Sequence, residues 1–143
     1  MVIKELGFEH YTKIQALWEE AGLSWRSVGR DHPDQIKKQL EKKNVFFLGE
    51  MKNDDLLGVV MVTHDGRKGW INRLAVHPKH RHRGIAQKLL EEAENRLFQT
   101  EGIEVISALI FEDNIPSLSL FERTGYEVWS NIRYYSKRKR PDA

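Results

Sequence analysis

The feature that most constrains this fold is a change of apolar pattern between Trp70 and Gln99. Residues up to Val76 carry the apolar and β-branched pattern of a strand. From about Arg83 to Gln99, apolar residues recur at the spacing of an amphipathic helix. The chain therefore contains a strand that leads into a helix through a short loop.

This loop between strand and helix is strongly basic. Its residues are His77, Pro78, Lys79, His80, Arg81, His82 and Arg83. Free N–H groups at a helix N-terminus bind phosphate, and the small residues Gly84 and Ala86 let a pyrophosphate approach the backbone closely. From the residues alone, a phosphate site and a solvated basic turn are both compatible with the loop. It lacks the Gly-Lys-Ser/Thr ending of a P-loop and the three glycines of a dinucleotide-binding motif.

The rest of the chain predicts an α+β domain with a mixed sheet. Strands are expected at Val2–Leu6, Val45–Glu50, Leu56–His64, Trp70–Val76, Val105–Phe111 and Val128–Tyr135. Helices are expected from Tyr11 to a stop at Gly22, over Pro33–Lys43, over Arg83–Gln99, and from an Asn114 N-cap to a stop at Gly125. Turns at Asn53–Asp55 and Asp65–Gly69 join three of the strands into an antiparallel meander.

Length and composition favour a single domain over residues 1–143. The longest apolar stretch, Leu56–Val62, is far shorter than the ~20 residues that span a bilayer. The N-terminus has no signal-peptide pattern, so we expect a cytoplasmic protein with no membrane contact. The absence of cysteine excludes disulfides, a thiolate nucleophile and cysteine-type zinc sites.

Two further hypotheses arise from the basic residues and the histidines. The loop and the tail Lys137–Arg140 suggest nucleic-acid binding, but the interleaved exposed aromatic residues of such surfaces are missing, so no nucleic-acid partner is predicted. His77, His80 and His82 suggest a metal site, but they lie among basic residues with no carboxylate close by. No metal is predicted.

The basic junction and a second motif downstream resemble the GNAT superfamily of N-acetyltransferases. The acyl-CoA motif of that family is Arg/Gln-x-x-Gly-x-Gly/Ala behind a strand that often ends Leu-Ala-Val-x-Pro. The matching residues are Arg81, Gly84 and Ala86, behind Leu74, Ala75, Val76 and Pro78. An Asn-containing turn and a Leu-Tyr-Glu-x-x-Gly-Phe/Tyr segment are matched by Asn114 and Leu120–Tyr126. The resemblance covers about residues 45–135, and the element order before them is similar.

The resemblance implies a GNAT-like fold and an acetyl-CoA site. The sheet is mixed and mostly antiparallel, with about four helices and a splayed central pair formed by the strands ending near Val76 and starting near Val105. Acetyl-CoA is the co-substrate. The residues expected to bind it are Leu74, Ala75 and Val76 on the pantetheine chain, the amides of Arg81, His82, Arg83, Gly84, Ile85 and Ala86 on the pyrophosphate, Asn114 on the lower part of CoA, and Phe121 beside the sulfur.

The sequence departs from the family at two catalytic positions. Phe121 stands where most relatives have a tyrosine that protonates the leaving thiolate, and Tyr126 is the candidate substitute acid. Asn72 stands where many relatives have a glutamate, and asparagine orients a water without taking its proton. Because a thiol has a pKa near ~8.5, loss of a general acid slows the reaction without preventing it.

The predicted function is transfer of acetyl from acetyl-CoA to an amine of a small molecule or peptide, by direct attack in a ternary complex. The alternative is a non-catalytic acyl-CoA-binding regulatory domain, which the two departures favour. Trp25 and Trp70 either line an acceptor pocket or pack in the core. A homodimer is compatible with the sequence, which does not identify the acceptor.

Overall fold

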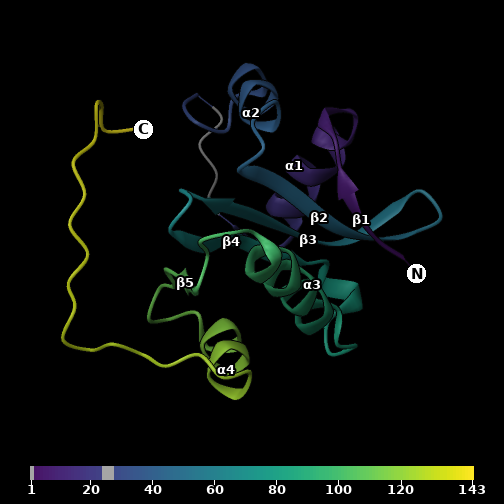
Figure 1. The fold of residues 1–143 in the computed structure, drawn as a ribbon. Coiled ribbons are helices and arrows are strands. Elements are labelled where there is room, and N and C mark those ends of the chain that lie inside the picture. The colour runs from purple at the N-terminus through teal and green to yellow at the C-terminus, as the bar shows by residue number, and fades with distance from the viewer. Residues whose placement is uncertain (1, 24–27) are drawn as a thin grey trace.

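The computed structural model describes residues 2–23 and 28–143, which form a five-stranded sheet with helices on both faces (Figure 1). The elements, in chain order, are β1 (Val2–Leu6), the 3₁₀ turn η1 (Phe8–His10), α1 (Tyr11–Glu20), α2 (Pro33–Leu40), β2 (Val45–Lys52), β3 (Asp55–His64), β4 (Lys68–Val76), the 3₁₀ turn η2 (Pro78–His80), α3 (Ile85–Gln99), β5 (Val105–Ala108) and α4 (Ile115–Arg123).

The strands lie in the order β1-β2-β3-β4-β5. Each neighbouring pair from β1 to β4 is antiparallel, and β5 lies parallel to β4. The predicted meander, the mixed sheet and the four helices are therefore confirmed. Asn53, with a φ of 56°, makes the turn between β2 and β3, a conformation that asparagine tolerates better than most residues.

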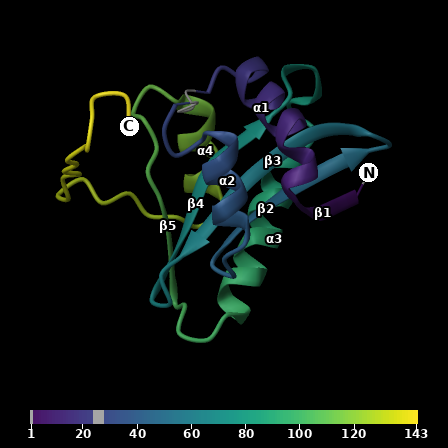
Figure 2. The same cartoon turned by 90° about the horizontal axis from the view of Figure 1, so that it is seen from above.

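Two apolar cores lie on opposite faces of the sheet. One packs α3 and α4 against the sheet, with Leu89 and Leu90 fully buried and Phe121 6% exposed. The other packs α1 and α2 against the opposite face, around Trp18 and Phe47. Figure 2, which turns the molecule by 90°, shows α1 and α2 lying across the strands with α3 behind them. The sheet is thus the middle of three layers.

The structure corrects the prediction after α4. The predicted strand Val128–Tyr135 is wrong, because residues 126–143 form neither helix nor strand. After Tyr126 the chain extends away from the sheet (Figure 1). A strand needs a neighbour to take its backbone hydrogen bonds, and this segment has none among the described residues. The predicted strand Val105–Phe111 also ends earlier, at Ala108.

Candidate active site

A bulge in β4 shapes the centre of the site. Val59 of β3 pairs with Ala75 of β4, and Met61 pairs with Asn72, so β4 has one residue more than β3 between these pairs. The additional residue of β4 is accommodated at Arg73, whose φ of 45° lies in the left-handed region. Bulges re-aim side chains, and this one turns both Asn72 and Arg73 toward the face that α1 covers.

The parallel pair β4 and β5 separates directly beside this bulge. Its last paired residues are Ile71 and Ala108. Beyond them β4 continues to Val76, whereas the chain of β5 leaves the sheet. The β4 backbone from Asn72 to Val76 therefore has no β5 partner on that side, among the residues described. This is the predicted splay, although the pair lies at the end of the described sheet and not at its centre. Leu74, Ala75 and Val76 border it.

The basic loop leads from the end of β4 to the start of α3. Arg81, His82 and Arg83 are exposed, and His82 has a φ of 64°. Gly84, with a φ of 78°, precedes the first residue of α3, Ile85, and no side chain caps this helix. A Cβ placed on Gly84 would meet nothing within 4 Å. The first N–H groups of α3 have no side-chain cap and follow directly after the exposed arginines, an arrangement that fits a pyrophosphate.

Two histidines make contacts that hold this loop in place. His80 lies 3.1 Å from the Arg83 guanidinium, and desolvation, then the charges of Arg83 and His77, lower the pKa of His80. His77 accepts a hydrogen bond from the Lys79 N–H at 3.1 Å and contacts the Glu20 carboxylate at the end of α1. The loop is therefore anchored to α1, and Lys79, Arg81 and Arg83 give it positive charge.

Phe121 and Tyr126 form one aromatic pair at the end of α4. Their ring centroids are 4.8 Å apart in an edge-to-face arrangement. The Tyr126 hydroxyl donates to Glu94 Oε2 of α3 at 2.7 Å. Burial, followed by this hydrogen bond and the carboxylate charge, raises the pKa of Tyr126. A tyrosine with a raised pKa is a weaker acid, so the present contacts favour an anchoring role for this hydroxyl.

Side-chain hydrogen bonds fix the orientation of the two predicted asparagines. Asn72 Nδ2 donates to Thr63 Oγ1 of β3 at 3.1 Å and to the Trp70 carbonyl at 3.4 Å. Asn114 Oδ1 accepts the Ser117 N–H at 3.3 Å and thereby caps α4. The predicted N-cap is confirmed. These contacts occupy the nitrogen of Asn72 and the oxygen of Asn114, so the opposite atom of each amide is available to a ligand.

The structure also reveals a polar network that the sequence analysis missed. Arg73 Nη1 lies 2.6 Å from Asp31 Oδ2, and the Asp31 side chain is only 3% exposed. The Arg73 guanidinium lies over the Trp18 ring, 4.9 Å from its centroid. The Tyr11 hydroxyl donates to the Asp31 carbonyl at 2.8 Å, and burial, then the Asp31 charge, raises the pKa of Tyr11. The network fixes Asp31, which lies just before α2, to the β4 bulge.

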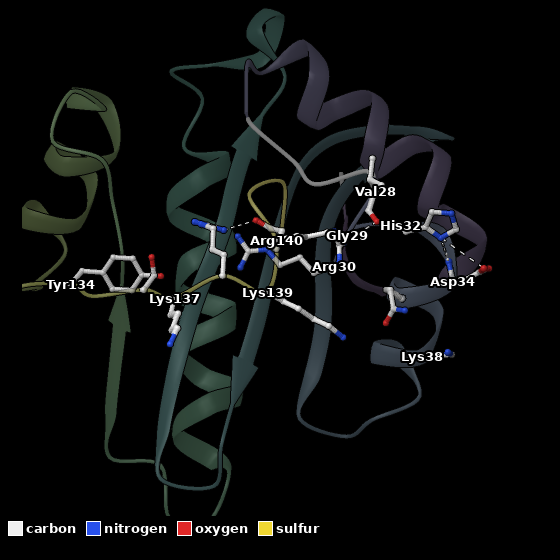
Figure 3. A pocket seen from close by; sticks show the side chains of 14 residues that line it. Val28, Gly29, Arg30, His32, Asp34, Lys38, Tyr134, Lys137, Lys139 and Arg140 are labelled. Carbon is white, nitrogen blue, oxygen red and sulfur yellow. Dashed lines mark hydrogen bonds and ion pairs between the residues drawn. The ribbon is translucent and has the colours of Figure 1, made fainter.

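A basic hollow of about 800 Å³ lies on the α2 side of the molecule (Figure 3). Its walls are the segment before α2, α2 itself and the C-terminal residues. Arg30, Lys38, Lys137, Lys139 and Arg140 line it, and Asp34 is its one acidic side chain among the described residues. The hollow does not contain the predicted acetyl-CoA residues. It adds positive charge to the side of the sheet opposite α3.

The remaining predictions concern the two tryptophans, metal binding and contact with a membrane. Trp70 is half-buried, with Lys68 Nζ 4.7 Å from its ring centroid, and Trp25 lies outside the described residues. Residues 2–23 and 28–143 contain no group of three His, Asp or Glu side chains arranged to hold a metal. Within the same ranges, no helix is long and apolar enough to cross a membrane.

Comparison with known proteins identifies the family. The family model described as acetyltransferase (GNAT) family matches residues 14–126. Among solved structures, PaiA N-acetyltransferase of Thermoplasma acidophilum, in complex with coenzyme A, is similar with 20% identity and a TM-score of 0.77, over 90% of this chain and 92% of that one.

Two further solved structures have the same fold. An aminoglycoside antibiotic 6'-N-acetyltransferase of Acinetobacter haemolyticus has 19% identity and a TM-score of 0.77, over 96% of this chain and 99% of that one. A ribosomal-protein-alanine N-acetyltransferase of Brucella melitensis biovar Abortus has 16% identity and a TM-score of 0.73, with the same coverage. Since the family model spans most of the sequence, the chain belongs to the GNAT family of acetyltransferases and is an acetyl-CoA-dependent N-acetyltransferase.

Proposed function

We propose that residues 1–143 act as one cytoplasmic domain that moves acetyl from acetyl-CoA to an amine by direct attack in a ternary complex. One observation carries the proposal. The end of β4 that has no β5 partner leads through the basic loop to the uncapped start of α3. An extended thioester chain and its pyrophosphate would therefore meet backbone groups of one continuous segment of this protein. The family match supports turnover over the non-catalytic alternative.

In this proposal the backbone does most of the binding. The amides from Arg81 to Ala86 hold the pyrophosphate, and Arg81 and Arg83 add full charges at the exposed loop. Leu74 to Val76 lie along the pantetheine chain. Asn114, whose oxygen caps α4, offers its Nδ2 group to the lower part of CoA. These residues bind and orient acetyl-CoA, and the reaction then needs only a positioned amine.

The chemical step requires the amine nitrogen to bond to the thioester carbonyl carbon while the carbon–sulfur bond breaks. A β4 backbone N–H beside the splay stabilises the negative charge that develops on the carbonyl oxygen. Asn72, held by Thr63, orients a water that accepts the proton lost by the amine. CoA leaves as the thiol once its sulfur takes up a proton. The chain has no cysteine that would carry the acetyl group itself.

The acceptor class is an amine of a small molecule or peptide. Structures similar to this chain include an aminoglycoside and a ribosomal-protein-alanine N-acetyltransferase, which supports an amine acceptor.

Thiol release from acetyl-CoA tests this function. A panel of neutral amines, acidic amines, peptides with free N-termini and one aminoglycoside is expected to give turnover with at least one acceptor. Initial rates are expected to give intersecting double-reciprocal lines, and intact mass spectrometry during turnover an unmodified chain. Acetyl-CoA binding without turnover on any acceptor contradicts catalysis, and a kinetically competent acetylated chain contradicts direct attack.

Phe121→Tyr tests whether residue 121 lies beside the CoA sulfur. The change adds a hydroxyl where most relatives have one, so kcat is expected to rise, by up to ~10²-fold if protonation of the thiolate limits the rate.

Tyr126→Phe removes the Glu94 hydrogen bond and is expected to lower the free energy of unfolding by about 1 kcal/mol while changing kcat little. Steady-state kinetics and urea unfolding measure both changes.

Two results would redirect this assignment. A large loss of kcat in Tyr126→Phe, together with no gain in Phe121→Tyr, moves the acid role to Tyr126. Phe121→Trp provides the steric test, because a larger ring beside the sulfur collides with the acyl chain. Unchanged acetyl-CoA affinity and turnover in a folded Phe121→Trp variant would exclude Phe121 from the thioester site.

A further inference from the structure

Arg73 occupies a backbone position that normally favours glycine. Its φ of 45° lies in the left-handed region, which only two other non-glycine residues of the described chain, Asn53 and His82, also adopt. A bulge with a residue in this region usually has glycine there, because a Cβ is strained in that conformation. The strain at Arg73 therefore indicates that the arginine side chain has a role of its own.

Buried contacts hold the Arg73 side chain in place. Its Nη1 atom lies 2.6 Å from Asp31 Oδ2, and its guanidinium lies 4.9 Å from the ring centroid of the fully buried Trp18. The side chains of Arg73 and Asp31 are 16% and 3% exposed, so water screens their attraction little. The Tyr11 hydroxyl donates to the Asp31 carbonyl and thereby holds the backbone that carries the carboxylate. These contacts offset the strain of the left-handed backbone.

The bulge reverses the alternation of side chains along the end of β4. Ile71, Leu74 and Val76 pack on the α3 face of the sheet, whereas Ala75 packs on the α1 face. In a strand without a bulge, residues 71, 73 and 75 would share one face and residues 74 and 76 the other. The extra residue at Arg73 therefore determines which way each residue from Leu74 to Val76 faces.

The same reversal determines which backbone groups point toward the splay. The His77 N–H donates to the Leu57 carbonyl of β3 at 2.8 Å. Since successive residues of a strand direct their backbone groups to opposite edges, the N–H groups of Val76 and Leu74 point away from β3 and toward the splay. Without the bulge, Leu74 would direct its N–H to β3 instead. The N–H that stabilises the thioester oxygen in the proposed reaction therefore depends on the conformation of Arg73.

We propose that Asp31 is a positioning residue for acetyl transfer. Through its ion pair with Arg73 it holds the left-handed conformation of the bulge, and the bulge directs the N–H groups of Leu74 and Val76 toward the bound thioester. Asp31 acts through Arg73 and not by contact with acetyl-CoA. The inference rests on the proposed function, because it requires the thioester to lie in the splay between β4 and β5.

An ion pair that only stabilises the fold is the alternative to a positioning role. Loss of such a pair would lower the free energy of unfolding and leave the surroundings of the thioester carbonyl unchanged. The carbonyl stretching frequency of bound acetyl-CoA separates the two roles, because a hydrogen bond to the carbonyl oxygen lowers this frequency. The measurement needs no acceptor, so it does not depend on the identity of the amine.

Infrared spectra of acetyl-CoA labelled with ¹³C at the thioester carbonyl provide the first test. In the wild type, the carbonyl band of bound acetyl-CoA is expected at lower wavenumber than that of free acetyl-CoA. Asp31→Asn keeps the shape of the side chain and removes its charge, so the band is expected to move toward its position in free acetyl-CoA. The dissociation constant is expected to rise by up to ~10-fold, the value of about one hydrogen bond.

Rescue by glycine provides the second test. Arg73→Gly and Arg73→Ala are each combined with Asp31→Asn, so both double variants lack the ion pair and the contact with Trp18. Glycine adopts a left-handed φ without strain, whereas alanine does not. The glycine double variant is therefore expected to return the carbonyl band to its wild-type position, and the alanine double variant is not. Urea unfolding measures the stability of both variants.

Gly66→Ala is the matched control for backbone strain. Gly66 has a left-handed φ of 84°, and a Cβ there would meet nothing within 4 Å. It lies in the turn between β3 and β4, at the opposite end of β4 from the splay. The substitution adds strain of the same kind away from the site, so the carbonyl band is expected to stay at its wild-type position. Circular dichroism checks that each variant folds.

Three outcomes would overturn the proposal. One is a carbonyl band at the same position in the wild type and in folded Asp31→Asn, a comparison that holds even if the alanine double variant does not fold. Another is a band at the same position in the folded glycine and alanine double variants. The third is a wild-type band that binding does not shift. Failure of the wild type to bind acetyl-CoA at all would instead contradict the proposed function, and the inference with it.

Discussion

Gly84→Glu is expected to weaken acetyl-CoA binding at least ~100-fold, which corresponds to about 2.7 kcal/mol. The new carboxylate would stand where the amides at the start of α3 meet the pyrophosphate, so it repels the phosphates and occupies their space. A side chain at this position also has to adopt the left-handed φ of 78°. Thermal unfolding with increasing acetyl-CoA measures the effect, and the wild type is expected to gain roughly 5–10 °C near saturation.

Gly66→Glu is the matched control for this experiment. Gly66 has a similar φ of 84°, and a Cβ at either glycine would meet nothing within 4 Å, but Gly66 lies in the turn between β3 and β4, at the opposite end of β4 from the loop. The control therefore reproduces the backbone strain and the added charge without touching the proposed pyrophosphate site. Equal stabilisation of both variants by acetyl-CoA would remove the loop from the binding site.

Arg73→Met is expected to lower the free energy of unfolding by about 3 kcal/mol. The substitution deprives the buried Asp31 carboxylate of a cation 2.6 Å away and removes the guanidinium from the Trp18 ring. Arg73 also occupies the bulge of β4, so the geometry of Leu74 to Val76 is expected to loosen and KM for acetyl-CoA to rise. Urea unfolding and steady-state kinetics measure the two effects.

Arg96→Met is the control for the loss of an arginine from an ion pair. Arg96 contacts Glu5 and Glu92 at the surface, where its side chain is 37% exposed, so a loss below about 1 kcal/mol is expected. A double-mutant cycle of Arg73→Met with Asp31→Asn isolates the interaction between the two groups. A coupling energy near zero would show that the network does not stabilise the fold.

Most of the regular structure is predictable from the sequence because it follows from local periodicity. The predicted strand Val2–Leu6 has its observed bounds, and α3 begins at Ile85 because Gly84 adopts a left-handed conformation just before it. The strand predicted at Val128–Tyr135 has the right pattern, but pairing depends on a neighbour that the pattern does not encode.

Part of the candidate site is likewise predictable from local sequence, and part of it depends on contacts between distant residues. The residues proposed for the pyrophosphate lie within one short motif, from Arg81 to Ala86, so their order along the chain makes them recognisable. The Arg73–Asp31 pair joins residues far apart in the sequence, and neither residue stands in a motif that predicts the contact. The engagement of the Tyr126 hydroxyl by Glu94 has the same origin, because α3 and α4 meet only in the folded chain.

The class of fold, the family and the loop proposed to meet CoA follow from the order of the residues, since each depends on residue types at short, fixed spacings. The three-dimensional fold determines where β4 and β5 separate and which buried carboxylate faces the β4 bulge. It also determines that the residues after Tyr126 extend away from the sheet (Figure 1). The physical reason is that these features depend on packing and hydrogen bonding between distant segments, whose free energies are set by spatial proximity rather than by position along the chain.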